Sequence, residues 1–295
     1  MSAVVNRGAS PQGRPDAPLR AQCEVLGSRR LGPYHSLTLV APDVAERTQP
    51  GQFVSLAVDG PGTLLRRPFS VYAVSKHGPW AGTVEVVFDV VGEGTRWLAQ
   101  RQKHDLVDVV GPLGKPFPLP QQPVSCLLVG GGYGAAPLLY LAQALQSLDL
   151  RVDMVLGAAT SERIFNAMEA KRRASSVEYT TDDGSFGSRG RVTDVVPRVL
   201  ERAGSGVIYA CGPMPMLAAV SRQAARLGVP CQVAVEEAMA CGVGVCWTCV
   251  VPVRRGEHVA NLRACIDGPV FNGARVDWDR LQPAPAAPAD GELTP

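Results

Sequence analysis

The sequence predicts three consecutive structural units: an antiparallel β-barrel, a doubly wound parallel-sheet α/β lobe, and a small cysteine-rich unit. Residues 19–118 contain short β-like runs separated by turn residues, residues 123–236 alternate strand and helix, and residues 237–281 carry four closely spaced cysteines. Regularly spaced short strands are typical of small barrels, whereas strand–helix alternation predicts a parallel sheet covered on both faces. We expect residues 1–18 and 282–295, which are rich in Pro, Gly and Ala, to be disordered tails.

Each unit is predicted from its own pattern. In the barrel, strand-like runs occupy residues 36–42, 51–60, 66–75 and 82–92, with one helix candidate at 94–102. In the lobe, strands are predicted at residues 126–131, 152–159, 177–181, 207–212 and 231–236, and helices at 136–148, 162–173, 193–203 and 215–228. The first lobe helix places four leucines on one face: Leu138, Leu141, Leu145 and Leu148. Ligands of such sheets bind at the carboxyl ends of the strands.

The composition excludes several classes of function. The 295-residue chain has a formal net charge of +2, and it lacks a basic block interleaved with aromatic residues, so no nucleic-acid partner is expected. No apolar run approaches the roughly 20 residues of a membrane-spanning helix, and the N-terminus lacks the apolar core of a secretory signal. We therefore expect a cytoplasmic protein without disulfides, in which Cys23, Cys126, Cys211 and Cys231 are buried thiols.

The cysteines Cys241, Cys246, Cys249 and Cys265 follow the pattern C-x4-C-x2-C-x15-C. The first three have the spacing with which plant-type ferredoxins hold a [2Fe–2S] cluster. A cluster needs its thiolates on one tight loop, and glycines between the first two cysteines allow the backbone to wrap closely. Structural zinc and chance clustering of buried cysteines are the alternatives. Zinc sites usually use two C-x2-4-C knuckles, and here Cys265 has no second cysteine beside it.

A glycine-rich turn follows the first predicted strand of the lobe. Gly130, Gly131, Gly132 and Gly134 precede a helix, and the run fits G-x-G-x-x-A, a form of the dinucleotide fingerprint. Backbone amides at such a helix start bind a pyrophosphate. The acidic residue expected at the end of the second strand is missing, because that strand ends Gly157-Ala158-Ala159-Thr160. A tight turn without a nucleotide is the alternative.

Two more strand ends carry candidate cofactor contacts. In residues 66–75 (RRPFSVYAVS), Arg67 can pair with a diphosphate and Ser70 can hydrogen-bond a flavin edge. An ordinary strand with exposed arginines is the alternative. In residues 207–217 (VIYACGPMPML), Cys211 ends a strand before a helix, where it could face a cofactor or simply be buried, and Pro213 suits the first helical position.

Taken together, these segments resemble the ferredoxin–NADP reductase superfamily. The more specific segments LLRRPFSVY, GEGT, VVGPLGKPF, TTDDGSFGSRGRVTD, EEAMACGVGVCWTC and ACIDGPVF resemble the electron-transfer subunits of class 1B dihydroorotate dehydrogenase. The resemblance spans about residues 20 to 280. Trp247 departs from the family pattern, because that position is often small or aliphatic.

The resemblance implies FAD in the barrel, NAD in the α/β lobe and a [2Fe–2S] cluster on the four cysteines. The implied FAD contacts are Arg67, Pro68, Phe69, Ser70, Val87, Phe88, Asp89, Gly94 and Thr95. The implied nicotinamide contacts are Gly130, Gly131, Gly132, Gly134, Pro137, Gly212, Pro213 and Met214, with Cys211 near the reacting atoms of nicotinamide and flavin. Ser161 and Arg163 could meet a 2′-phosphate, although the resemblance favours NAD. Glu236 and Glu237 are expected to be solvated charges rather than proton carriers.

The resemblance also implies a reaction and a partner. The chain would accept electrons from an FMN-containing dihydroorotate dehydrogenase catalytic subunit and reduce NAD+, in a heterotetramer with two copies of each subunit. This would serve pyrimidine biosynthesis. Two alternatives remain: an NAD(P)H-dependent flavin and iron–sulfur reductase subunit serving a hydrogenase or ferredoxin, and a zinc-stabilised, non-redox interaction module.

Overall fold

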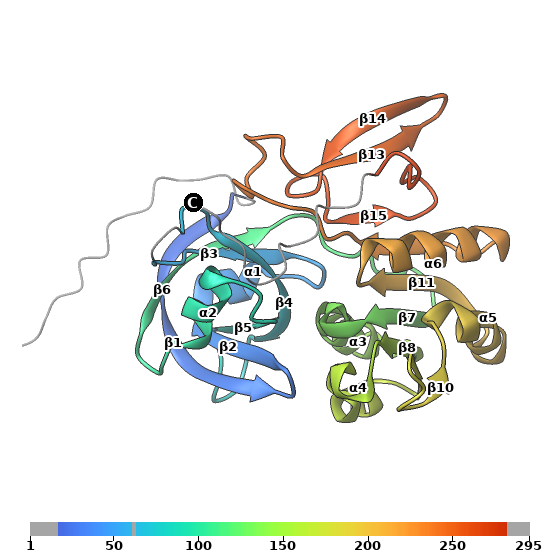
Figure 1. Cartoon of the computed structure of the whole chain (residues 1–295), viewed down its shortest axis with the longest axis horizontal. Helices are drawn as coiled ribbons and strands as arrows, with labels where there is room; N and C mark the ends of the chain where they lie inside the picture. The colour runs from blue at the N-terminus through green and yellow to red at the C-terminus, as the bar shows by residue number, and fades with distance from the viewer. Residues whose placement is uncertain (1–16, 61–62, 282–295) are drawn as a thin grey trace, which may run out of the picture.

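The computed structural model describes residues 17–60 and 63–281 and confirms the predicted fold class (Figure 1). The two predicted tails lie outside the described residues, apart from Ala17 and Pro18. A closed barrel lies beside a parallel sheet, and a hairpin from the C-terminal part of the chain projects above both.

The barrel closes from six strands that pair antiparallel in the order β1-β2-β5-β4-β3-β6. Their bounds are β1 (Leu19–Leu31), β2 (Tyr34–Val40), β3 (Phe53–Leu56), β4 (Arg67–Ser75), β5 (Thr83–Phe88) and β6 (Leu106–Leu113). Alternate β-branched and leucine side chains fill its interior, including Leu37, Val54, Val86 and Val109. Helix α2 (Glu93–Ala99) is shorter than predicted, and the short α1 (Pro42–Arg47) was not predicted. Six residues are too few to show a helical repeat, and α1 forms because Val44 and Ala45 pack on the barrel.

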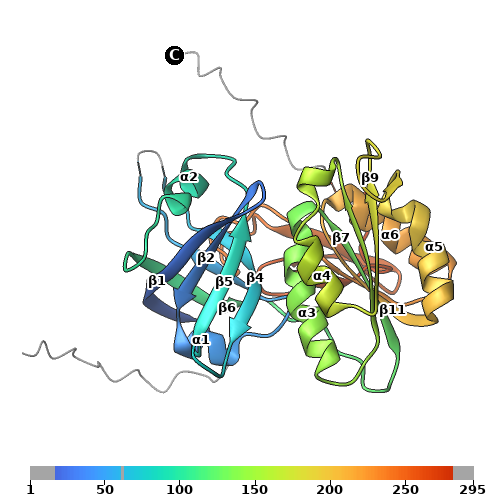
Figure 2. The same ribbon diagram turned by 90° about the horizontal axis from the view of Figure 1, so that it is seen from below.

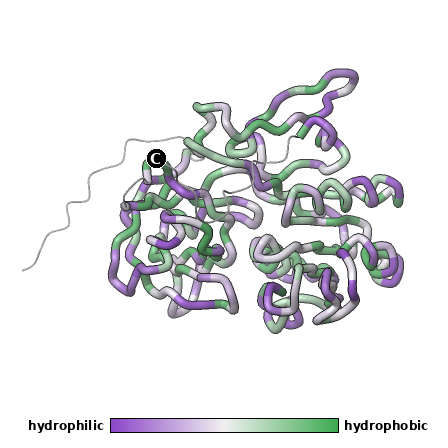
Figure 3. Tube along the Cα trace, in the orientation of Figure 1, coloured by the Kyte–Doolittle hydropathy of each residue, from purple (hydrophilic) through white to green (hydrophobic). Residues whose placement is uncertain are grey.

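The lobe is a seven-stranded sheet in the order β10-β9-β8-β7-β11-β12-β15. Its strands are β7 (Ser125–Gly131), β8 (Val152–Ala158), β9 (Ser176–Thr181), β10 (Ser188–Arg189), β11 (Ser205–Cys211), β12 (Cys231–Ala234) and β15 (Val270–Asn272). Figure 2 shows α3 (Ala136–Gln146) and α4 (Ala167–Arg173) on one face, and α5 (Val192–Ala203) and α6 (Met214–Arg226) on the other. Apolar strands lie between these helix layers, as the hydropathy colouring shows (Figure 3).

Two helix predictions are corrected by the structure. The helix predicted at residues 162–173 begins only at Ala167, after a 3-10 turn at Ser161–Arg163 (η2). Asn166 stops it from starting earlier, because Asn166 has a left-handed backbone and its side chain caps the amide of Glu169. Leu148 lies beyond the end of α3 and is 49% exposed, so only the other three leucines of the predicted face are buried.

The C-terminal segment is integrated with the lobe. Strand β15 adds antiparallel to β12, pairing Ala234 with Val270, so a segment predicted with the cysteine unit completes the edge of the sheet. A hairpin of β13 (Val250–Arg255) and β14 (His258–Arg263) projects beyond it (Figure 1). Cys249 and Cys265, at the base of this hairpin, share one core with Leu217 of α6.

Buried tyrosines connect the barrel to the lobe. Helix α3 packs on β4, and its Tyr140 lies in the barrel core, where the hydroxyl donates to the carbonyl of Thr48 at 3.0 Å. Tyr34 of β2 donates in the same way to the carbonyl of Arg163 at 2.9 Å, from the barrel into the lobe. Because these carbonyls would lose their partners if the two units separated, the hydroxyls fix the relative position of barrel and lobe.

Replacing Tyr140 by Phe should lower the free energy of unfolding by about 1–2 kcal/mol, because it leaves the buried Thr48 carbonyl without a donor. Urea unfolding followed by circular dichroism measures the change. Tyr133→Phe is the matched control, since its hydroxyl donates to Glu236, whose side chain is exposed to solvent and can be hydrated when the bond is lost. Equal losses in the two variants would contradict the role given to Tyr140.

Candidate functional site

A pocket of about 250 Å³, here called the barrel pocket, lies where the barrel meets the lobe. The barrel contributes residues from β4, from β5 and the residue after it, and from the start of α2. The FAD contacts predicted from the sequence that line this pocket are Arg67, Pro68, Phe69, Ser70, Val87, Phe88, Asp89 and Thr95. The lobe contributes Pro137, Cys211 and Gly212, together with residues that follow β12. The structure thus brings residues far apart in the chain to one cavity.

The polar end of the barrel pocket suits a diphosphate. A Cβ atom on Gly94 would lie 2.9 Å from Nε of Arg67, so the glycine lets the guanidinium lie against the start of α2. Thr95 fixes that start, because its hydroxyl oxygen accepts from the amides of Val91 and Gly92 at 3.0 and 3.2 Å. A guanidinium beside a helix N-terminus is a favourable place for phosphate oxygens.

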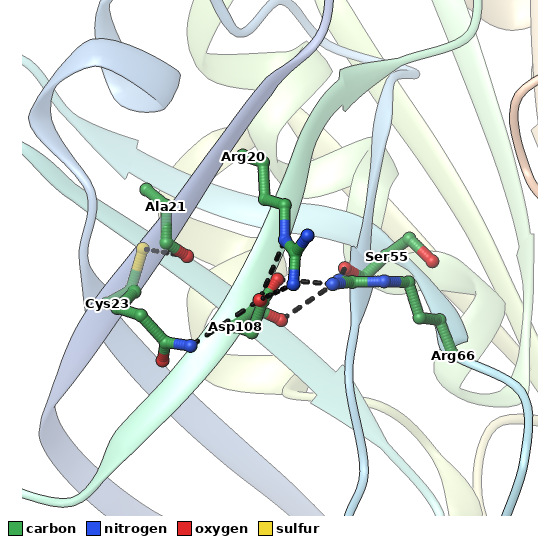
Figure 4. A network of polar contacts seen from close by, with 7 residues as sticks. Arg20, Ala21, Cys23, Ser55, Arg66 and Asp108 are labelled. Atoms are coloured by element: carbon green, nitrogen blue, oxygen red, sulfur yellow. Dashed lines mark hydrogen bonds and ion pairs between the residues drawn. The ribbon is translucent and has the colours of Figure 1, made fainter. Parts of the chain in front are cut away.

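A network of polar contacts around Asp108 holds Arg66, the first of two adjacent arginines (Figure 4). Arg66 pairs with the Asp108 carboxylate and donates to the carbonyls of Ser55 and Asp108 at 3.0 and 3.1 Å. Arg20 donates to the same carboxylate at 2.9 Å. Partial burial would raise the pKa of Asp108, but the hydrogen bonds from Arg20 and Arg66 hold it below its ordinary value. Arg66 is therefore tied to the barrel wall, while Arg67 lines the pocket.

A second pocket of about 500 Å³, here called the dinucleotide pocket, lies at the carboxyl ends of the parallel strands. The turn after β7 contributes Gly131, Gly132 and Gly134, and the turn after β11 contributes Gly212 and Pro213. A Cβ on Gly134 would lie 2.7 Å from Cα of Gly212, so the two turns approach backbone to backbone. Both turns place backbone on the wall of this pocket, where amides suit a pyrophosphate.

Some residues from the sequence motifs have other positions. Pro137, expected at the nicotinamide site, lines the barrel pocket and not the dinucleotide pocket. Gly130 lines neither pocket, and a Cβ there would lie 2.7 Å from the Cβ of Ala135, so this glycine allows α3 to pack close to β7. Met214 also lines neither pocket and packs against the core. Pro213 is the N-cap of α6 rather than its first helical residue.

A wall formed by Tyr133, Gly134, Gly212 and Glu236 lines both pockets. The hydroxyl of Tyr133 donates to Oε1 of Glu236 at 3.1 Å, and burial followed by the charge of Glu236 raises the pKa of Tyr133. The sequence motif contained Tyr133 but gave it no role, because a variable position inside a glycine turn does not reveal where its side chain points.

The acidic and thiol groups beside the wall have shifted pKa values. Burial, and then the charge of Glu236, raises the pKa of the Cys211 thiol to about 12, so this thiol is neutral at physiological pH. Burial also raises the pKa of Glu237. Glu236 is exposed, as expected of a solvated charge, whereas Glu237 is half-buried, and both line the barrel pocket.

The cysteine loop folds around the first of its thiols. The backbone amides of Val243, Val245 and Cys246 donate to Sγ of Cys241 at 3.4, 3.3 and 3.4 Å. The loop has left-handed backbone at Gly242 and Gly244, within this wrap, and at Trp247 directly after it, with φ values of +70°, +83° and +57°. Backbone amides around a sulfur stabilise a thiolate, which is the form that binds iron.

The four thiols lie near one another, since the pKa of Cys265 is affected by both Cys249 and Cys241. Burial, and then a hydrogen bond to Cys249, raises the pKa of Cys265 to about 12, and Cys246 likewise lies beside Cys241. Within residues 17–60 and 63–281, no three His, Cys, Asp or Glu side chains converge on a single metal position. Structural zinc requires four ligands on one ion, whereas a [2Fe–2S] cluster spreads four thiolates over two irons. The C-x4-C-x2-C spacing of three of the donors matches the cluster-binding pattern of plant-type ferredoxins.

Two family models match the chain. Residues 236–277 match the iron–sulfur cluster binding domain of dihydroorotate dehydrogenase B, and residues 128–222 match the oxidoreductase NAD-binding domain.

Among the described residues, no helix is long and apolar enough to cross a membrane.

Relatives cover nearly the whole chain. A protein of Geobacillus thermodenitrificans is 42% identical over 87% of this chain and 98% of its own length. A protein of Desulforamulus reducens is 38% identical over 81% of this chain and 90% of its own. Both are named dihydroorotate dehydrogenase B (NAD(+)), electron transfer subunit.

Two solved reductase structures also match the chain. A chain of an NADH-dependent reduced ferredoxin–NADP oxidoreductase, studied for flavin-based electron bifurcation, matches with a TM-score of 0.76 and 33% identity, over 88% of this chain and 91% of that one. The ferredoxin reductase of carbazole 1,9a-dioxygenase matches with a TM-score of 0.61 and 25% identity, over 72% and 67% of the two chains.

The matches confirm the resemblance found in the sequence. The iron–sulfur and NAD-binding models, together with the flavoprotein reductase fold, confirm the predicted cofactor set of [2Fe–2S], NAD and FAD. With relatives more than 30% identical over most of its length, the chain belongs to the family of dihydroorotate dehydrogenase B electron transfer subunits.

Proposed function

We propose that this chain is the subunit that reduces NAD+ with electrons taken from an FMN-containing catalytic subunit, which oxidises (S)-dihydroorotate to orotate. The complex would hold two copies of each subunit and would serve pyrimidine biosynthesis in the cytoplasm. The names of the relatives support the reaction, and the position of the barrel pocket carries the proposal.

That position is between the other two sites. On one side the wall around Tyr133 and Gly212 is shared with the dinucleotide pocket. On the other side Met239 lines the barrel pocket two residues before Cys241 of the cysteine loop. When bound, a [2Fe–2S] cluster carries single electrons and FAD exchanges either single electrons or a hydride, so the central position suits the flavin.

The barrel pocket has a charged part and an uncharged part, which suit different parts of the flavin. We assign the FAD diphosphate to Arg67, Gly94 and Thr95, where the guanidinium lies against the start of α2. The uncharged walls from β4 and β5 would hold the ring system, through Pro68, Phe69, Ser70, Val87 and Phe88. Asp89 lines the pocket directly after β5.

The dinucleotide pocket would hold NAD+ with its pyrophosphate on the turn from Gly131 to Gly134. Gly212 and Pro213 would place the nicotinamide near Cys211, beside the shared wall. Because its pKa is raised, Cys211 would act there as a small neutral side chain that excludes water, not as a thiolate nucleophile.

The partner would dock on the cysteine loop. Val243, Val245 and Trp247 are exposed apolar side chains on the loop that also exposes Cys246. The guanidinium of Arg263 lies 4.4 Å from the centre of the Trp247 ring and donates to the carbonyl of Gly244 at 2.6 Å, which supports the loop. An exposed apolar patch around a redox ligand suits a protein partner.

A reductase subunit serving a ferredoxin or a hydrogenase is the second candidate. The observation that favours it is the likeness to the NADH-dependent reduced ferredoxin–NADP oxidoreductase, which covers 88% of this chain. The two candidates differ in the electron donor and share the site described above.

Reconstitution with the FMN-loaded catalytic subunit should give dihydroorotate-dependent NAD+ reduction, measured as NADH absorbance. Cys246→Ser should lower this rate by at least roughly 100-fold, because a cluster ligand is lost. NADH oxidation by a small dye needs only the flavin and the dinucleotide pocket, so the variant should keep that activity as a control. Reduction of NAD+ by reduced ferredoxin alone, with none from dihydroorotate, would identify the second candidate.

Trp247→Ala should weaken binding of the catalytic subunit by roughly 10- to 100-fold, as expected of a central aromatic contact. Isothermal titration calorimetry with the cofactor-loaded subunits measures this change. Trp80→Ala is the matched control, since Trp80 is 62% exposed on the barrel, between β4 and β5. If both variants bound like the unmodified chain, the docking surface would lie elsewhere.

Cys211 should react with iodoacetamide about 1,000-fold more slowly in the folded chain than in urea at pH 8, because its pKa rises from 9.0 to about 12 and only the thiolate reacts. In the folded chain, the rate of Cys211 alkylation should increase about tenfold per pH unit up to pH 11. Peptide mass spectrometry after timed quenching measures it. Similar rates in the folded and unfolded chain would contradict a buried, neutral thiol.

A further inference from the structure

The DDGSFGSRG segment is the motif whose role the proposed function leaves open. Its first residue, Asp182, follows β9 directly. Strand β9 pairs parallel with β8, with Ala158 opposite Thr181, and the amide of Asp182 donates to the carbonyl of Ala158 at 3.1 Å. Asp182 therefore lies beside the end of β8, and it lines the dinucleotide pocket together with Ala158 and Ala159.

This is where dinucleotide-binding sheets need an acidic residue, and β8 does not provide one. Strand β8 ends in small residues, and a Cβ on Gly157 would lie 2.5 Å from Val192 and 2.9 Å from the hydroxyl of Thr180. No larger side chain fits at Gly157. The neighbouring strand β9 therefore places a carboxylate at the position where β8 has only alanines.

The Asp182 carboxylate is available to a ligand. Among the residues that the structure describes, its side chain makes no hydrogen bond or ion pair, whereas the carboxylate of the adjacent Asp183 accepts from the amide and hydroxyl of Ser185 at 2.9 and 2.6 Å. Arg163 follows β8 in the chain and lines the same pocket, but its guanidinium pairs with Asp89 at 2.6 Å. Arg191, at the start of α5, is a further cation on the wall of this pocket.

We propose that Asp182 makes the dinucleotide pocket select NAD+ over NADP+. Its carboxylate accepts hydrogen bonds from the 2′- and 3′-hydroxyls of the adenosine ribose, and its charge repels the 2′-phosphate of NADP+. Asp89 supports this choice by pairing with Arg163, one of the two arginines on the wall of this pocket, so that less positive charge is free to attract that phosphate. The inference rests on the proposed function of this pocket as the NAD site.

The test is the ratio of the dissociation constants of NADP+ and NAD+, measured by calorimetry on the cofactor-loaded full chain without its partner. Asp182→Asn should lower this ratio at least roughly tenfold, through weaker NAD+ binding and stronger NADP+ binding, because a charge-assisted hydrogen bond and a repulsion are both lost. ADP-ribose and its 2′-phosphate should show the same change, since they probe the adenosine half alone.

Asp183→Asn is the matched control and should leave the ratio unchanged, because that side chain faces Ser185 and does not line the pocket. Asp182→Ser repeats the test with a smaller side chain, in case the amide disturbs the turn. A preference of the unmodified chain for NADP+, or an unchanged ratio in both Asp182 variants, would overturn the inference alone. If neither dinucleotide bound the unmodified chain, the proposed function would fail, and this inference would fail with it.

Discussion

The packing of α3 against β4 is the contact on which the other features of the site depend. Helix α3 begins at the glycine turn of the dinucleotide pocket and buries Tyr140 in the barrel core. Strand β4 carries Arg67 to Ser70 into the barrel pocket. This one helix–strand contact therefore sets both pockets relative to each other, and it makes a shared wall possible.

The cysteine loop is held to the same framework by its buried cysteines. Cys249 and Cys265 lie in the core that contains Leu217 of α6, and β15 continues the sheet from the same segment. Forty residues could not bury enough apolar surface to fix such a loop alone. By sharing the core of the lobe, the segment keeps two thiols rigid and leaves Cys246 and its apolar neighbours at the surface, where a partner can reach them.

Local pattern predicted the elements and motifs, whereas pairing between distant segments determined the features it missed. Alternation and glycine turns are local, so the barrel, the lobe and the cysteine loop could be predicted. The pairing of Val270 with Ala234 joins residues from two predicted units, and no local signal marks it. The same limit explains Asp182: its acidic residue type was visible, but its position beside Ala158 depends on the register of two strands.

The two adjoining pockets carry side chains of opposite charge at their far ends, and each charge suits the group expected to bind there. Arg67 stands at the end suited to a diphosphate, where positive charge is favourable. Cys211 lines the barrel pocket beside the shared wall, and its buried thiol is neutral, so no thiolate competes for a proton or repels a reduced flavin there. Asp182 brings negative charge to the far end, where the neutral ribose hydroxyls are donors and a further phosphate would be repelled. Because burial keeps the Cys211 thiol neutral, Glu236 is the one charged residue of the shared wall, and its carboxylate is exposed to solvent, which screens it better than a buried thiolate would be screened.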